Sequence, residues 1–284
     1  MKFQYIVFII NICCLSKIAN SSPVTGVCKD TLGNPIAFVN VSAKMTGIGT
    51  VTDTNGFFHL NGDLFNDIDT LVFTHIGYKT HSISAKRKDL LVIQLQPSEY
   101  SLKGVTISPS ESNYKNKKII GTKANTDHVI MKFSSGNLGT EIGKIIKVKK
   151  GRKYKVEKVS FNISELDYKQ AKFRINFYNV YENDSISTIR INYHDYFKDV
   201  GEIGLIEIDL ENEDLVFKSD FLVAIEWIDY VNNPSTDTLS HKHISFNSTV
   251  FSGPFYSRTN NVSKWNNNNF KYNVGLGIYL LVKY

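Results

Sequence analysis

The feature that most constrains the fold is the recurrence of short β-favouring runs between turn residues. Runs rich in Val, Ile, Phe, Tyr and Thr alternate with clusters of Gly, Asn, Asp and Pro along the whole chain, and helical periodicity is scarce. Such runs favour strands. The apolar fraction of 42% and the charged fraction of 21% are typical of soluble globular proteins, and 284 residues are enough for two ordinary domains. The sequence therefore predicts an all-β chain of two domains.

The first 22 residues have the layout of a secretory signal peptide. Lys2 precedes an apolar run from Tyr5 to Leu15, and small residues follow at 19–22. The run is too short to span a bilayer comfortably. We expect cleavage within 19–22 and an exported protein, located in the periplasm, in the outer membrane or at the cell surface.

Loss of the signal peptide changes the cysteine count and the charge. It removes Cys13 and Cys14 and leaves Cys28, which has no partner for an internal disulfide and lies in an apolar run, so a buried, unreactive thiol is expected. The formal net charge falls from +6 to +4, because the segment contains two lysines and no acidic residue. So small an excess argues against a nucleic-acid partner.

The segment GTVTDTNGFFHL, residues 49–60, has the strongest local signal in the chain. An EF-hand reading with Gly56 at the sixth position places Val51 and Gly62 where the first and twelfth calcium ligands should be. A turn fits better, because Asp53 can cap it and Gly56 can adopt a positive φ. The sequence therefore predicts that residues 53–56 close a β-hairpin.

Five motifs follow one another within about residues 23–107: GVCKDTLGNPIAFVNVS, GTVTDTNGFFHL, LVFTHIGYKT, LVIQLQP and LKGVTI. This segment resembles the carboxypeptidase regulatory-like domain, a transthyretin-like β-sandwich. That domain is common in exported proteins of Bacteroidetes-type bacteria and also occurs ahead of TonB-dependent outer-membrane receptors. About seven short strands in the segment agree with such a sandwich. The motifs consist of glycines and turn residues, so the resemblance implies a fold and no chemistry.

Catalytic and metal-binding motifs are missing from the sequence. A zinc carboxypeptidase needs a His followed by Glu three residues later, and no histidine in this chain has one. HExxH, the nucleophile elbow and the phosphate loop are missing as well. His241 and His243 share a face of a candidate strand near Asp237, but a solvent-facing strand end is the favoured interpretation. We expect no catalytic residue, no cofactor and no metal site.

The rest of the chain predicts a linker and a second domain. Residues 108–123, SPSESNYKNKKIIGTK, are polar and are interpreted as the linker. Residues 124–284 contain about nine strand candidates and no convincing helix, which predicts a larger, jelly-roll-like β-sandwich. This region is loosely similar to uncharacterised domains of the same bacterial group.

Glu226 is the most informative polar residue of the second domain. It lies in the apolar segment DFLVAIEWI, where a carboxylate is costly unless it is paired. Arg174, Asn176 and Tyr178 share one face of the segment FRINFY, and Arg258 is a second candidate partner. A buried structural ion pair with Arg174 or Arg258 is the favoured interpretation. The alternative is a polar groove that binds a sugar or a peptide.

Trp265 is the remaining candidate site residue. It lies in the Asn-rich segment SRTNNVSKWNNNNF. A tryptophan on an exposed loop suits stacking on a sugar or a protein–protein hot spot. An anchor that fixes the loop to the sheet is slightly favoured.

These observations predict a non-catalytic accessory or binding protein of the cell envelope. The expected partner is an envelope protein or a glycan, with peripheral association with the outer membrane as a further expectation. One alternative is a glycan-acting hydrolase with Glu226 as acid or base, which would need a second carboxylate across a cleft. Another is a small outer-membrane β-barrel with a periplasmic N-terminal domain, because the chain ends in the alternating IYLLVKY. The other strands lack the clean alternation that such a barrel requires.

Overall fold

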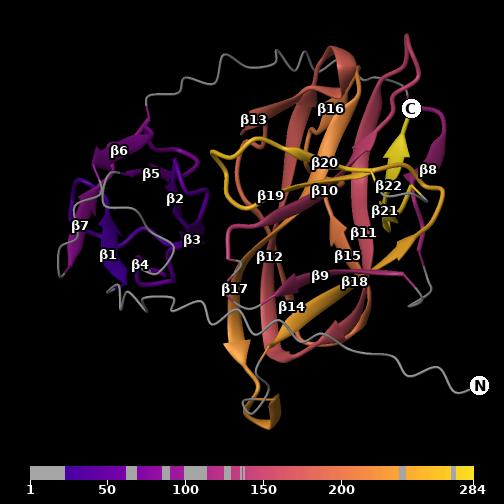
Figure 1. Ribbon diagram of the computed structural model, residues 1–284. Helices are drawn as coiled ribbons and strands as arrows, with labels where there is room; N and C mark the ends of the chain where they lie inside the picture. Colours follow the sequence, from indigo (N-terminus) through magenta and orange to yellow (C-terminus); the bar gives the residue numbers. More distant parts are fainter. Residues whose placement is uncertain are drawn as a thin grey trace, which may run out of the picture.

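A computed structural model of the protein describes residues 23–61, 69–84, 90–98, 114–124, 129–134, 136, 138–236, 241–269 and 273–284. These residues form two β-sandwiches side by side (Figure 1), which confirms the predicted all-β fold class. The predicted signal peptide lies outside the described residues. Among the described residues, no helix is both long enough and apolar enough to cross a membrane.

The first domain is a sandwich of two small sheets. One sheet has the order β4-β1-β7 and the other the order β3-β2-β5-β6. The strands are β1 (Val24–Lys29), β2 (Asn40–Ala43), β3 (Gly49–Val51), β4 (Phe57–Leu60), β5 (Thr70–Thr74), β6 (His81–Ser84) and β7 (Leu91–Gln94). All described pairs are antiparallel except β1 with β7, which is parallel. The two sheets enclose a core of aliphatic and aromatic side chains that includes Cys28.

The turn at residues 53–56 is present, but the predicted hairpin is wrong. Gly56 has φ +76°, and Oδ1 of Asp53 accepts hydrogen bonds from the backbone N–H groups of Asn55 and Phe57 at 2.8 and 2.9 Å. However, β3 pairs with β2 and β4 pairs with β1, in different sheets. The segment is therefore a corner that carries the chain from one sheet to the other. A single sequence cannot show this, because a corner and a hairpin use the same turn residues.

The second domain is a larger sandwich. Its seven-stranded sheet has the order β13-β12-β17-β10-β19-β20, with β14 also paired to β12. Its eight-stranded sheet has the order β21-β18-β11-β22-β8, with β15 and β16 paired to β11 and β9 paired to β18. The strands are β8 (Lys117–Gly121), β9 (Ile130–Ser134), β10 (Glu141–Ile146), β11 (Tyr154–Leu166), β12 (Tyr168–Val180), β13 (Ile186–Arg190), β14 (Tyr196–Val200), β15 (Gly204–Asp209), β16 (Val216–Phe217), β17 (Phe221–Asn232), β18 (His243–Thr249), β19 (Phe255–Arg258), β20 (Asn266–Asn268), β21 (Gly275–Leu276) and β22 (Ile278–Lys283). Two short 3-10 turns, η2 (Glu182–Asp184) and η3 (Pro234–Thr236), interrupt them.

The core of the second domain lies between these two sheets. The chain crosses between the sheets repeatedly, as jelly-roll sandwiches do. Aromatic side chains fill the interior, including Phe161, Phe173 and Phe246, whose rings pack at centroid distances of 5.7 to 6.1 Å.

The predicted linker is shorter than 108–123. Residues 117–121 form β8, which pairs along its length with β22 and makes an edge of the eight-stranded sheet. The sequence KKIIG has an alternating pattern of exposure in this strand, and its lysines and the preceding serines gave the segment the composition of a linker.

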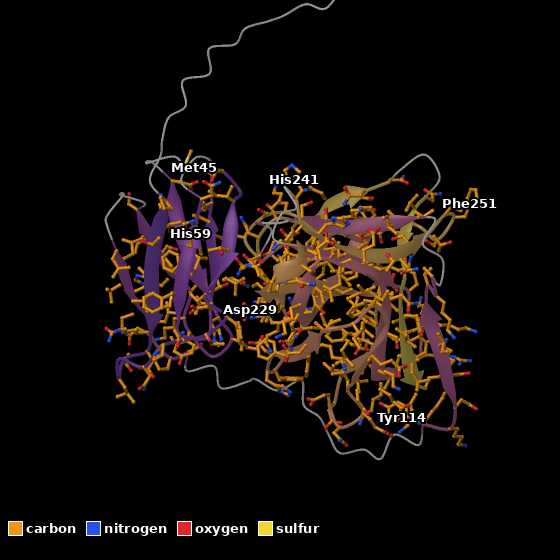
Figure 2. The ribbon with its side chains drawn as sticks, turned by 90° about the horizontal axis from the view of Figure 1, so that it is seen from below. Met45, His59, Tyr114, Asp229, His241 and Phe251 are labelled. Atoms are coloured by element: carbon orange, nitrogen blue, oxygen red, sulfur yellow. The ribbon has the colours of Figure 1, made fainter. Side chains whose placement is uncertain are left out.

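The two domains contact each other through the outer faces of two sheets. Figure 1 shows β12 and β17 on the side of the second domain that is turned toward the first. β2 of the first domain is buried at all four positions, although only Val41 and Ala43 belong to its own core. Its polar face, Asn40 and Ser42, faces the second domain, and Figure 2 shows Asp229 at the boundary between the two domains. The seven-stranded sheet is thus covered on both faces.

Candidate functional site

Four charged residues lie in a row across the seven-stranded sheet. Arg174 on β12 is directly opposite Glu226 on β17, Glu226 is opposite Glu141 on β10, and Glu141 is opposite Arg258 on β19. We call these four residues the charged row. Directly opposite residues on adjacent strands have Cβ atoms about 5 Å apart. The register of three strand pairs therefore brings together four charges that are far apart in the sequence.

Arg174 binds Glu226 in a bidentate ion pair. Its Nε and Nη2 atoms donate to Oε2 and Oε1 of Glu226 at 2.9 and 2.8 Å. Both side chains are fully buried. Two parallel charge-assisted hydrogen bonds are the strongest geometry available to this pair. Of the two partners predicted for Glu226, Arg174 is the one that binds it in the structure.

Arg258, the other predicted partner, binds Glu141 instead. Its Nε and Nη2 atoms donate to Oε1 of Glu141 at 2.9 and 2.6 Å. The hydroxyl of Tyr178 donates to Oε2 of Glu141 at 2.7 Å and accepts from Nη2 of Arg258 at 2.7 Å. Glu141 was not identified from the sequence, because nothing in the segment EIGKII reveals its register with β17.

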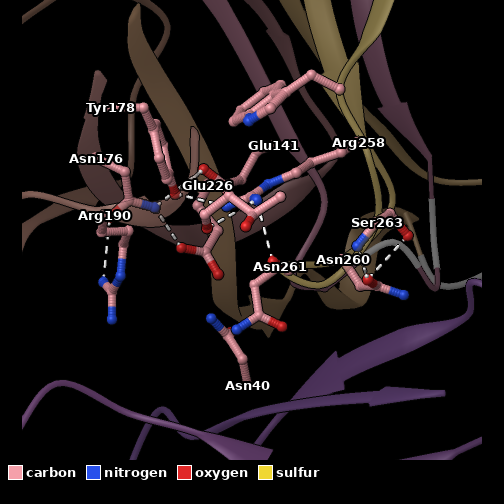
Figure 3. A network of polar contacts seen from close by, with 12 residues as sticks. Asn40, Glu141, Asn176, Tyr178, Arg190, Glu226, Arg258, Asn260, Asn261 and Ser263 are labelled. Atoms are coloured by element: carbon pink, nitrogen blue, oxygen red, sulfur yellow. Dashed lines mark hydrogen bonds and ion pairs between the residues drawn. The ribbon is translucent and has the colours of Figure 1, made fainter. Parts of the chain in front are cut away.

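Asn176 connects the two ion pairs. Its Nδ2 atom donates to Oε2 of Glu226 at 2.6 Å and to Oε2 of Glu141 at 3.1 Å (Figure 3). Its Oδ1 atom accepts from Nη1 of Arg190 at 3.1 Å, and Arg190 in turn donates to Asp195 at 2.7 Å. Each buried polar atom of Asn176 thus has a partner, as a buried amide requires.

Trp265 anchors its loop to this network. Its ring lies 4.5 Å from the guanidinium carbon of Arg258 and packs edge-on against Tyr178 at 5.2 Å. Its Nε1 donates to the carbonyl oxygen of Ser187 at 3.1 Å. These contacts agree with the anchor interpretation of Trp265.

The first domain closes the network from outside. Arg174 donates through Nη1 to the carbonyl oxygen of Phe38 at 3.1 Å and through Nη2 to Oδ1 of Asn40 at 3.0 Å. Figure 3 shows Asn40 reaching toward the charged row from the ribbon of the first domain. Phe38 has a φ of +58°, a conformation that is unfavourable for a bulky side chain. Beyond Glu226, Arg174 therefore bonds the first domain, and its Nη1 also lies 3.5 Å from Asp195 of its own domain.

A second group of contacts joins the domains beside the row. The hydroxyl of Ser42 donates to Oδ1 of Asn261 at 2.8 Å, and Asn261 also bonds Thr74. The hydroxyl of Thr259 donates to the carbonyl oxygen of Gly47 at 2.6 Å. The segment after β19 is thus bonded to β2, to β5 and to the turn that follows β2, all within one sheet of the first domain.

Electrostatics keep Glu226 ionised. Burial alone would raise the pKa of Glu226, but the Arg174 guanidinium, with help from Arg190 and Asn176, holds the pKa below its ordinary value of 4.5. The same pairing raises the pKa of Arg174 although burial opposes it. A general acid needs the opposite shift, toward a raised pKa.

This arrangement bears directly on the hydrolase alternative. Glu226 and Glu141 are a pair of nearby carboxylates, but both are 0% exposed and both are bound to arginine. A glycosidase needs two carboxyl groups that reach the substrate from either side of the scissile bond. The charged row therefore has the geometry of a structural ion network and not that of a cleft.

An open groove lies on the other sheet of the second domain. It has a volume of about 540 Å³ and crosses the outer face of the eight-stranded sheet, and it is lined by Lys123, Asn162, Ile163, Ser164, Ile203, Gly204, Leu205, Asn247 and Tyr279. The size is within the range of about 300–1,000 Å³ that is typical of ligand sites. Sequence analysis did not identify any of these residues.

Strand register explains how the groove is assembled. Asn162 on β11 is opposite Leu205 on β15. On the other side of β11, Ile163 is opposite Phe246 of β18, which places Asn247 beside Asn162. Tyr279 on β22 is opposite Ser160 of β11. Alternation along each strand then sends these side chains outward while Phe161, Ile206 and Ile278 enter the core.

The groove combines an apolar side with hydrogen-bonding groups. Ile203 is 63% exposed and Leu205 is 53% exposed, which is unusual for such large apolar side chains. Tyr279 contributes an aromatic ring, and the side chains of Asn162 and Asn247 contribute amides. Nδ2 of Asn162 donates to the carbonyl oxygen of Ala124 at 2.9 Å, which fixes the orientation of this amide.

The structure places the candidate metal ligands His241 and His243, and the single cysteine of the first domain, Cys28. Ring nitrogens of His243 lie 3.0 Å from Glu165 and from Asp167, on a part-exposed strand end, whereas His241 is exposed and Asp237 lies outside the described residues. Within the described part of the chain, no cluster of three metal-ligating side chains occurs. Cys28 is buried and free, and burial raises the pKa of its thiol to about 12, so it is unreactive.

Comparison with known proteins identifies the first domain. Residues 24–107 match the family model described as CarboxypepD_reg-like domain, which confirms the resemblance noted from the sequence motifs. No curated protein matches the chain.

Solved structures give only distant likenesses. The cysteine protease and lectin-like domains of Cwp84, a surface layer associated protein of Clostridium difficile, share 13% identity over 56% of this chain and 36% of that chain, with a TM-score of 0.35. The Clostridial protease Cwp84 after propeptide cleavage shares 12% identity over 82% of this chain and 50% of that chain, with a TM-score of 0.41. A Streptococcal ancillary pilin shares 9% identity over 85% and 54%, with a TM-score of 0.21. This chain thus spans about half or less of these proteins, and likenesses at this level carry no conclusion about its function.

Proposed function

Residues 24–107 are a carboxypeptidase regulatory-like domain, and from this premise we propose that the protein is an exported, non-catalytic binding protein of the cell envelope that takes a glycan in the groove of its second domain. The first domain covers one face of the second, so the ligand approaches the opposite, eight-stranded sheet. The carboxylates nearest to each other in the covered sheet are buried and ion-paired, which supports the non-catalytic part of the proposal.

The observation that carries the proposal is the composition of the groove. Tyr279 offers a ring on which the apolar face of a sugar can stack, and the half-buried side chains of Asn162 and Ser164 offer polar groups for its hydroxyl groups. The exposed side chains of Ile203 and Leu205 add apolar contact without closing the groove. A few placed polar groups beside apolar ones are what small-ligand sites have in common. A glycan fits this mixture better than an extended protein surface, which would need a larger apolar patch.

Export is supported by the sequence pattern of residues 1–22, and the mild net charge of the remaining chain supports a partner other than nucleic acid. Envelope location and peripheral association with the outer membrane are parts of the same proposal. The alternative of a hydrolase that uses Glu226 is not favoured, because its carboxylate has no access to a substrate.

The test is binding of the mature chain to a glycan array, followed by calorimetry with the glycans that bind. Tyr279→Ala should abolish binding and leave the melting temperature close to that of the wild type, because the ring lies on the outer face. Tyr181→Ala is the matched control, since Tyr181 is an exposed tyrosine that does not line the groove. Unchanged glycan binding by Tyr279→Ala would contradict the proposal.

A further inference from the structure

Lys123 differs from the other lysines of this sheet face. On β11 and β22 the lysines are paired with carboxylates: Lys155 with Asp214, Lys158 with Glu207, and Lys283 with Glu211. Lys123 is exposed in the groove, and within the described part of the chain no carboxylate lies at ion-pair distance from it. Among the described residues, the groove therefore contains a cation that no carboxylate neutralises at ion-pair distance.

The Lys123 ammonium contacts an aromatic ring of the groove. Its Nζ lies 5.1 Å from the centroid of the Tyr279 ring. A cation over an exposed aromatic ring is held weakly compared with a charge-assisted hydrogen bond to an anion. An incoming negative group can therefore draw the ammonium away from the ring and leave the ring face open for stacking.

We propose that the glycan bound in this groove carries a negatively charged group, a carboxylate or a sulfate, and that Lys123 is the residue that selects for it. This inference rests on the proposed function. The ammonium binds the charged group, Tyr279 stacks on the sugar ring that carries it, and the side chains of Asn162 and Ser164 contact hydroxyl groups on the adjoining part of the saccharide.

The electrostatic surroundings favour this assignment. Glu207 on β15 is bound by Lys158, and Glu165 on β11 is bound by Lys132, so neither of these carboxylates presents free negative charge to the ligand. The Lys123 ammonium can also donate to a hydroxyl oxygen of a neutral saccharide, but this hydrogen bond is weaker than one to an anion, and the ammonium would still have to leave the Tyr279 ring. Charge therefore discriminates between ligands at this position.

The experiment uses pairs of oligosaccharides that differ in charge alone. The first pair is a galacturonate oligomer and its methyl ester, and the second is a carrageenan oligosaccharide and its desulfated form. Calorimetry on the mature chain should give at least about tenfold tighter binding to the charged member of one pair, which is the scale of a hydrogen bond to a charged group. The pair that responds distinguishes a carboxylate from a sulfate. The preference should decrease with added salt.

Two variants complete the test. Lys123→Gln should bind both members of the pair equally, at the affinity of the neutral one, while Lys169→Gln, an exposed lysine on the other sheet, should retain the wild-type preference. Equal binding of charged and neutral members by the wild type, or a preference that survives in Lys123→Gln, would overturn the inference. If the wild type binds neutral glycans and Tyr279→Ala does not, the proposed function stands even where the charge preference is missing. Absence of glycan binding by the wild-type chain would refute both the charge preference and the proposed function.

Discussion

Glu141 and Glu226 lie directly opposite each other on adjacent strands, and one amide nitrogen, Nδ2 of Asn176, donates to both carboxylates. Like charges in such positions are destabilising on their own. An arginine on each outer strand compensates them, so the row reads Arg174, Glu226, Glu141, Arg258 across the sheet. Each carboxylate therefore has its own arginine partner at a site where both side chains are fully buried.

Removal of one member of the charged row should be costly. Glu226→Ala leaves Arg174 buried with part of its partners gone, and we expect a loss of about 3 kcal/mol or more in the free energy of unfolding. Glu226→Gln keeps the shape and one acceptor, so it should cost less. Urea unfolding of both variants measures this, with Glu182→Gln as a control at an exposed carboxylate. Wild-type stability of Glu226→Ala would show that the row contributes nothing.

The two domains should unfold together. Asn40→Ala removes the acceptor for Nη2 of Arg174 in the first domain and should destabilise the protein by about 1.5–3 kcal/mol, the range for hydrogen bonds to charged groups. Calorimetry should show one transition for the wild type. Two separate transitions in the wild type, or an effect of Asn40→Ala no larger than that of the exposed control Asn55→Ala, would contradict this coupling.

The corner at residues 53–56 can be tested with two glycines. A Cβ on Gly56 would lie 2.6 Å from the carbonyl oxygen of Cys28, whereas a Cβ on Gly33 would meet nothing within 4 Å, and both residues have positive φ. Gly33→Ala therefore measures the backbone strain alone, and Gly56→Ala should be clearly more destabilising. Calcium should leave the melting temperature unchanged in each case. A calcium-dependent rise would instead support a metal site.

His75 should make stability depend on pH. Burial is the main cause that lowers its pKa below 6.5, Asp195 opposes this effect, and the nearby Arg174 and Arg190 add to it. A histidine whose pKa is depressed by folding favours the folded state above about pH 6.5, and this contribution is lost as the pH falls, since the unfolded chain binds the proton more readily. Between pH 7.5 and 5 the free energy of unfolding should decrease, and His75→Gln should flatten that slope. His59→Gln is the control and should keep the wild-type slope. If His75→Gln has the same slope as the wild type, His75 is excluded as the cause.

Export predicts a specific mass. Protein isolated from the native host should begin between residues 20 and 23, because the segment with Lys2 and the apolar run is removed during secretion. Intact-mass spectrometry decides the matter. A mature envelope protein that retains Met1 would contradict the prediction.

Local sequence signals predicted the elements well and their relationships less well. The alternation in IAFVNVSAK predicted the two faces of β2, and the apolar setting of Glu226 predicted a buried, paired carboxylate. The choice of Arg174 over Arg258 depends on the register of β12 with β17, and register follows from long-range pairing that no local pattern records. The same reason explains why Glu141, the corner at residue 53 and the groove were missed.

The polar face of β2 shows a second limit. Asn40 and Ser42 alternate with apolar residues, which is the ordinary pattern of a strand with one face in water. Here that face is covered by the second domain. A polar face and a face that binds polar partners have the same sequence pattern, so only the assembled structure distinguishes them.

The contact between Arg174 and the first domain limits how this architecture can be rearranged. Domains of the first type are compact and could in principle be exchanged between proteins as interchangeable modules. In this protein an exchanged domain would have to present a carbonyl group in place of that of Phe38 and an acceptor in place of Asn40, or it would leave two buried N–H donors of Arg174 without these acceptors. A chimera with a foreign first domain should therefore fail at the junction even when each half is sound, and the two halves are expected to have been inherited as one unit.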